Sequence, residues 1–115
     1  MMKNSEINIE VVLDENKIPQ SIAWKASESS ADEKQHAKAV FLAFWDGVEK
    51  SAMRIDLWTK DMMVDEMADF YYQVFITMAD TFKRATGYDE LTADIKTFAN
   101  TFHKKFVDEE NKKNL

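Results

Sequence analysis

The sequence predicts an α+β domain: a four-stranded antiparallel sheet made of two hairpins, followed by two amphipathic helices packed side by side on one face of the sheet. Apolar residues alternate with period two in the first half, and they recur at three- and four-residue steps in the second half. Turn-forming residues separate the segments. Because strands come first and helices second, the order ββββαα indicates α+β rather than α/β.

The first hairpin is predicted from two alternating segments. In residues 6–13, EINIEVVL, the residues Ile7, Ile9, Val11 and Leu13 point one way. Residues 14–17, DENK, form a turn, because Asp and Asn bond their own backbone and tolerate tight turns. Residues 18–26 alternate again, with Pro19 at a strand start or an edge because proline has no N–H to donate. We therefore expect a half-buried hairpin.

The next segments are a loop and an ambiguous apolar run. Residues 27–36 are polar and are expected to be a flexible loop. Residues 37–46 fit helical spacing, but 39–45 are apolar on every side, which suits a central strand covered on both faces better than a surface helix. We favour the strand, although periodicity alone leaves the helix open. Asp46-Gly47 is a turn signal.

The last strand and the two helices follow. Residues 51–59 alternate, with Met53, Ile55 and Leu57 on one face, and Thr59 or Asp61 is expected to cap a helix. A stripe of apolar residues defines each helix. The first stripe is Met63, Met67, Phe70, Tyr71, Val74, Phe75, Met78 and Phe82, and the second is Leu91, Ile95, Phe98, Phe102 and Phe106. Gly87 should end the first helix, and residues 108–115 should be a frayed tail.

Length and composition restrict the classes of function. The chain has 115 residues, which fits a single domain over 1–115, and 45% of them are hydrophobic. It has no cysteine, which excludes disulfides, thiolate catalysis and Cys-based zinc sites and favours a reducing compartment. The net charge of −6 argues against nucleic-acid partners.

We also expect a cytoplasmic protein that does not insert into membranes. No apolar run of signal-peptide length follows the first residues, and the longest run, 39–45, is far shorter than the ~20 residues of a membrane span. The chain has two glycines, so a glycine-rich phosphate loop is missing. No grouping of nucleophile and base stands out either. The sequence therefore predicts no enzyme, no catalytic residue and no cofactor.

Acidic residues around the first helix raise the question of a metal site. Asp61, Asp65 and Asp69 stand four residues apart and would share one helix face, with Glu66 nearby. Carboxylates in this arrangement can bind a hard cation. Acids in a first turn also complement the helix dipole, which explains them without a ligand. A small ligand-binding or divalent-metal-binding module on this face is thus the alternative function, and we assign no metal ligand.

The strongest candidate for a functional surface is the apolar third strand together with the polar side of the fourth. If the helices cover one sheet face, the other face exposes an apolar strip, and such patches mark partner sites. The predicted interaction surface comprises Val40, Leu42, Phe44, Arg54, Asp56 and Trp58. Its partner would be a second copy or another protein. Alternatively, the loop or the tail folds over the strip, and Arg54 and Asp56 form a solvated ion pair.

Several stretches resemble one protein family. RIDLWTKDMMVDEM (54–67), MADTFKRATG (78–87), SEINIEVVLDENKIPQSIAW (5–24) and AKAVFLAFWDG (37–47) are similar to the gliding motility protein GldC, and the likeness weakens after about residue 90. The resemblance implies a small accessory protein of bacterial gliding, working beside membrane-associated gliding components. It implies no enzymatic activity and no catalytic residues. The expected function is therefore a non-enzymatic interaction protein whose partner belongs to the gliding machinery.

Overall fold

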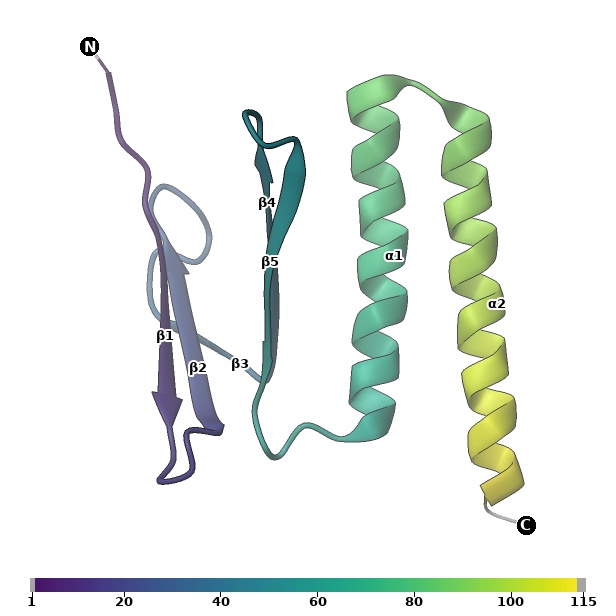
Figure 1. Cartoon of the computed structure of the whole chain (residues 1–115), viewed down its shortest axis with the longest axis horizontal. Helices are drawn as coiled ribbons and strands as arrows, with labels where there is room; N and C mark the ends of the chain where they lie inside the picture. Colours follow the sequence, from purple (N-terminus) through teal and green to yellow (C-terminus); the bar gives the residue numbers. More distant parts are fainter. Residues whose placement is uncertain (1, 114–115) are drawn as a thin grey trace. The chain divides into compact units, whose positions relative to one another are not determined.

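A computed structural model of the chain describes residues 2–113, with strands first and helices second (Figure 1). The chain divides into two compact units, Met1–Met62 and Met63–Leu115. The strands of the first unit are β1 (Ile7–Leu13), β2 (Pro19–Ala26), β3 (Gln35–Ala37), β4 (Ala39–Asp46) and β5 (Ser51–Trp58). The helices of the second unit are α1 (Val64–Thr86) and α2 (Asp89–Lys113). The α+β class and the antiparallel strands are confirmed.

The strands form two sheets, so the prediction of one four-stranded sheet is wrong. The order is β1-β2-β3 in the first sheet and β4-β5 in the second. The difference arises at Lys38, a single bent residue between β3 and β4, where the chain stops pairing with β2 and begins pairing with β5. Such bends allow one chain segment to serve two sheets. The placement of the helices on a sheet face, and the single domain, stay predictions.

The first hairpin agrees with its prediction. Ile9 lies opposite Trp24 and Val11 opposite Ile22, so apolar residues of β1 and β2 share one face. The side chain of Asp14 accepts the backbone N–H groups of Asn16 (2.8 Å) and Ile18 (3.1 Å), which holds the turn. Strand β3 pairs with the other edge of β2, and Ile22 is only 1% exposed. This three-stranded sheet carries the core of the first unit.

The segment expected to be a loop is partly structured. Residues 35–37 form β3, a strand too short and too polar to show alternation in the sequence. Before it, the backbone of Ala26 donates to the carbonyl of Ala31 (2.7 Å), and the hydroxyl of Ser29 donates to the carbonyl of Ala26 (2.8 Å). At the other end of the chain, α2 continues to Lys113, through most of the expected tail. The mobility of 27–36 and of 108–115 stays a prediction.

The strand alternative for residues 37–46 is confirmed, but its expected burial on both faces is not. Strand β4 pairs with β5 alone, and Phe44 and Trp45 are 58% and 69% exposed. A central strand would have neighbours on both sides, and β4 has one within residues 2–113. Among the described residues, β4 is therefore an apolar strand of a two-stranded sheet and not the centre of a larger one.

The helical unit is an antiparallel pair held by aromatic rings. Phe75 packs edge-to-face on both Phe98 and Phe102, with ring centroids 5.5 Å apart in each case. Polar pairs tie the flanks: the Lys96 ammonium lies 2.8 Å from the Asp80 carboxylate, and the Tyr72 hydroxyl donates to the side chain of Asn100 (3.0 Å). The two apolar stripes therefore meet each other, as their helical spacing suggests.

The ends of α1 were predicted with mixed success. Gly87 ends the helix with φ +77°, and its N–H donates to the carbonyl of Lys83 (2.8 Å), as expected for a left-handed cap. The predicted N-cap at Thr59 or Asp61 is wrong. The helix begins at Val64, and the Met63 N–H donates to the carboxylate of Glu66 (3.1 Å).

Candidate interaction surface

The β4–β5 hairpin is built around the turn after Asp46. The Asp46 carboxylate accepts the backbone N–H groups of Val48 (2.8 Å) and Glu49 (3.0 Å), and these two bonds lower its pKa. Lys50 takes a positive φ of 53° and donates its N–H to the Asp46 carbonyl. This turn sets the register, in which Asp46 lies opposite Ser51 and Ala39 opposite Trp58.

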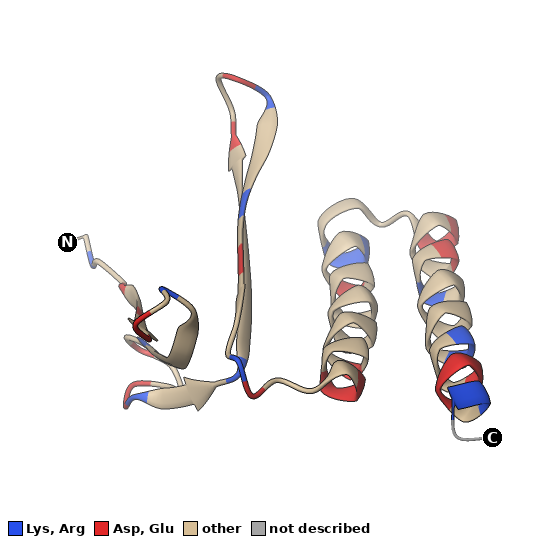
Figure 2. Ribbon diagram, turned by 60° about the horizontal axis from the view of Figure 1, so that its bottom comes forward, with Lys and Arg blue, Asp and Glu red and all other residues tan. Residues whose placement is uncertain are grey.

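That register produces a face with only apolar side chains. Directly opposed residues of an antiparallel pair project to the same side. Val40 lies opposite Leu57, Leu42 opposite Ile55, and Phe44 opposite Met53. We call these six residues the hairpin face: Val40, Leu42, Phe44, Met53, Ile55 and Leu57. Its outer half, the part nearest the turn, is exposed to solvent, since Phe44 is 58% and Met53 62% exposed. Figure 2 shows charged residues at the tip, in the middle and at the base of this hairpin, and none of the six residues of the hairpin face is among them.

The opposite face of the hairpin carries the charge. Arg54 and Asp56 form a two-bond ion pair along β5, with Nη2 to Oδ1 at 2.8 Å and Nε to Oδ2 at 3.3 Å. The guanidinium also lies over the ring of Phe41, 5.6 Å from its centroid. Trp58 sits on this side opposite Ala39. Both charged side chains are more than 40% exposed, so the pair contributes little to folding.

The six residues predicted as one surface thus occupy two faces. Val40, Leu42 and Phe44 belong to the hairpin face, whereas Arg54, Asp56 and Trp58 project to the other side. Met53, Ile55 and Leu57 complete the hairpin face and were not part of the predicted surface. The signal for them was the turn: once Asp46 is placed opposite Ser51, the pairing of every later residue follows.

Thr59 closes the first unit where β5 ends. It is 2% exposed, and its backbone N–H donates to the carbonyl of Lys38 (2.7 Å), at the bend between the sheets. Its hydroxyl donates to the carboxylate of Asp61 (2.5 Å), and this bond lowers the pKa of that group. The next N–H, of Lys60, donates to the carbonyl of Pro19 in β2 (3.1 Å). The backbone bonds of Thr59 and Lys60 therefore tie the end of β5 to the bend and to β2, and neither Thr59 nor Asp61 caps a helix.

The acidic residues do not form the expected common helix face. Asp61 precedes α1 and is bonded to Thr59, so only Asp65 and Asp69 of the series are helical. The Asp65 carboxylate accepts the N–H of Glu66 (2.9 Å), and Asp69 lies 3.9 Å from a ring nitrogen of His103. Among the described residues, no group of three or more His, Cys, Asp or Glu side chains is arranged to hold a metal ion.

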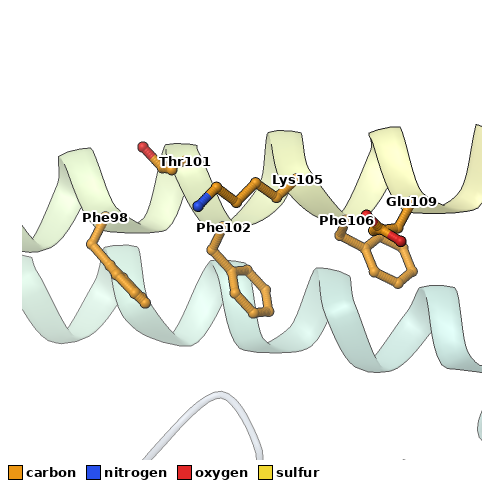
Figure 3. Close-up of a pocket in the computed structure, with 6 residues that line it drawn as sticks. All are labelled: Phe98, Thr101, Phe102, Lys105, Phe106 and Glu109. Atoms are coloured by element: carbon orange, nitrogen blue, oxygen red, sulfur yellow. The ribbon is translucent and has the colours of Figure 1, made fainter.

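Helix α2 bears a shallow apolar hollow of about 500 Å³. Phe98, Phe102 and Phe106 line it along one side of the helix, and Lys105 and Glu109 stand at its rim (Figure 3). Phe98 remains 53% exposed. Among its described lining residues, the polar ones are Thr101, Lys105 and Glu109.

Neither helix, over the residues described, is long and apolar enough to cross a membrane.

The comparisons with known proteins point to one family. Comparison with curated proteins and with solved structures found no match. Residues 19–108, by contrast, match the family described as gliding motility-associated protein GldC-like. The match runs beyond residue 90, where the resemblance weakened, and it covers most of the chain. The chain therefore belongs to the GldC-like family of gliding motility-associated proteins.

Proposed function

We propose that this protein is a non-enzymatic accessory component of gliding motility that acts by binding another protein of the gliding machinery through its hairpin face. The family supports the process. The binding mode rests on one observation, the six-residue face of β4 and β5 that has no polar member and whose outer half is exposed. A cytoplasmic location stays a prediction.

The chemistry of the hairpin face favours a protein partner. Soluble proteins rarely leave contiguous apolar side chains in water, and such patches mark sites of protein association. Phe44 and Met53 are opposite each other and are the most exposed members of the face. An aromatic ring beside a flexible thioether makes an adaptable contact for an apolar partner surface. Two such anchors are enough to dominate the binding energy of an interface.

The test exchanges these anchors for small polar residues in a gliding host. We expect Phe44→Ser with Met53→Ser to abolish or strongly slow cell movement and to remove a gliding component from the proteins captured with the tagged chain. The matched control is Val48→Ser, which changes a side chain that is 88% exposed in the turn, outside the hairpin face. Normal gliding by the double variant at wild-type protein level would contradict the proposal.

A further inference from the structure

The outer edge of β5 is a second unusual feature of the hairpin. Within the described residues, β5 hydrogen-bonds to no strand other than β4. The strand has eight residues, Ser51–Trp58, which is long for an unprotected edge. A sheet of two strands is marginally stable in water, and three or more strands with an apolar face are needed for independent stability. The edge of β5 is therefore a site where another strand would add stability.

The residues of β5 are arranged symmetrically about Ile55. Arg54 and Asp56 flank it with opposite charge, and Met53 and Leu57 lie beyond them as apolar residues of similar size. When two identical strands pair antiparallel across a twofold axis, residues equally far from the axis face each other. With the axis at Ile55, Arg54 faces Asp56 of the partner subunit, and Met53 faces Leu57 of the partner subunit.

The charges also disfavour the neighbouring registers. Moving the axis to Arg54 places this guanidinium opposite Arg54 of the partner subunit, and moving it to Asp56 places two carboxylates opposite each other. Like charges directly across a ladder are destabilising. If the axis instead falls between two residues, Arg54 lies opposite Ile55 or Leu57 of the partner subunit, and both of these belong to the hairpin face. The axis at Ile55 is thus the register in which charge and apolar character both match.

We propose that β5 pairs antiparallel with β5 of a second copy of this chain, with the twofold axis at Ile55. The pairing joins the two hairpins into one four-stranded sheet and makes the two hairpin faces continuous. Strand β4 is the less suited edge, because its residues 39–45 carry no charge that would select a register. This inference deepens the proposed function by naming one partner of the same hairpin. It uses the strand edge, whereas gliding-partner binding uses the face. Met53 belongs to both, so the edge is tested with Arg54 and Asp56, which lie outside the hairpin face.

Two complementary charge reversals test the pairing. Arg54→Asp sets a carboxylate against Asp56 of the partner subunit, and Asp56→Arg sets a guanidinium against Arg54 of the partner subunit. We expect the wild-type chain to sediment as a dimer at micromolar concentration and each variant alone as a monomer. An equimolar mixture of the two variants should form heterodimers, because every cross-strand pair is then again opposite in charge. The ion pair within each chain stays broken in the mixture, so its loss cannot explain the result.

The proposal is overturned if the wild-type chain stays monomeric, if either variant alone dimerises like the wild type, or if the mixture stays monomeric while circular dichroism shows both variants folded. A second measurement covers the case of unfolded variants. The chain has no cysteine, so Ile55→Cys introduces a single thiol at the proposed axis. Under a mild oxidant it should form a disulfide-linked dimer quickly. The control Val48→Cys, in the turn, should link much more slowly, and equal rates would also overturn the pairing.

These results separate the inference from the proposed function. If Arg54→Asp and Asp56→Arg leave the oligomeric state unchanged while Phe44→Ser with Met53→Ser still stops gliding, the dimer is wrong and the gliding role stands. If the dimer forms as expected while the double serine variant glides normally, the hairpin face is not the gliding contact.

Discussion

The two β-hairpins of the first unit have similar ingredients and opposite surroundings. Each turn is held by an aspartate whose carboxylate accepts two backbone N–H groups, Asp14 in one and Asp46 in the other. Each turn ends in a lysine with positive φ, Lys17 or Lys50. The first hairpin gains a third strand, and Ile22 becomes buried. Within residues 2–113 the second gains none, and Ile55 stays 49% exposed. Whether a hairpin forms, and whether another strand then pairs with it and buries its apolar residues, are therefore separate questions in this chain.

The largest expected effect comes from a matched pair of substitutions. Ile22→Ala removes a fully buried side chain and should lower the free energy of unfolding by about 2–5 kcal/mol. Ile55→Ala should cost less than about 1 kcal/mol, because that side chain is half exposed in the monomer. Urea unfolding followed by tryptophan fluorescence measures both, since Trp24, Trp45 and Trp58 all lie in the first unit. If both substitutions lower the free energy of unfolding of the dilute monomer equally, the proposed difference in burial between the two hairpins is contradicted.

The residue that joins the two sheets should give an intermediate effect. Thr59→Val keeps the size of a buried side chain but removes the hydroxyl that donates to Asp61. We expect a loss of about 1–2 kcal/mol in the free energy of unfolding. Thr59→Ser retains the hydroxyl and serves as the control, with a smaller loss. If both variants are equally destabilised, the hydroxyl bond is not what holds this corner.

Acid should weaken the same corner. The hydroxyl of Thr59 holds the pKa of Asp61 below its ordinary value of 3.8, so the folded state binds this proton less readily than the unfolded chain. The resulting stabilisation is present above the unfolded pKa and is lost as the pH falls through the folded pKa. Urea midpoints measured between about pH 7 and about pH 3 should fall less steeply for Asp61→Asn than for the wild type. Parallel curves would contradict this role.

The smallest effect is expected from the exposed ion pairs of the two hairpins. Arg54→Ala removes the pair with Asp56, and Lys34→Ala removes the pair with Glu10. Both pairs are about half exposed, so each variant should change the free energy of unfolding of dilute monomer only slightly. At concentrations where the chain dimerises, only Arg54→Ala should also weaken association. A comparable loss of association with Lys34→Ala would argue against a specific role for β5.

Local patterns were enough to predict much of this fold. Alternation predicted β1, β2 and β5, and helical spacing predicted both helices and the stop at Gly87. The family followed from residues such as those at 54–67. The predicted interaction surface stays a prediction, and the register divides it, because Arg54, Asp56 and Trp58 project away from Val40, Leu42 and Phe44. Strand β3 was missed because three residues are too few to show a period.

The division between sequence and tertiary structure has a physical origin. Backbone preference and side-chain periodicity act over a few residues, so the sequence by itself determined where strands, helices and turns lie. Which strand pairs with which depends on contacts between distant residues, and these were decided only in the folded chain. The bend at Lys38, bonded to Thr59 twenty-one positions later, divides one expected sheet into two. Among the described residues it leaves β5 paired with β4 alone, and Phe44 and Met53 of the hairpin face more than half exposed.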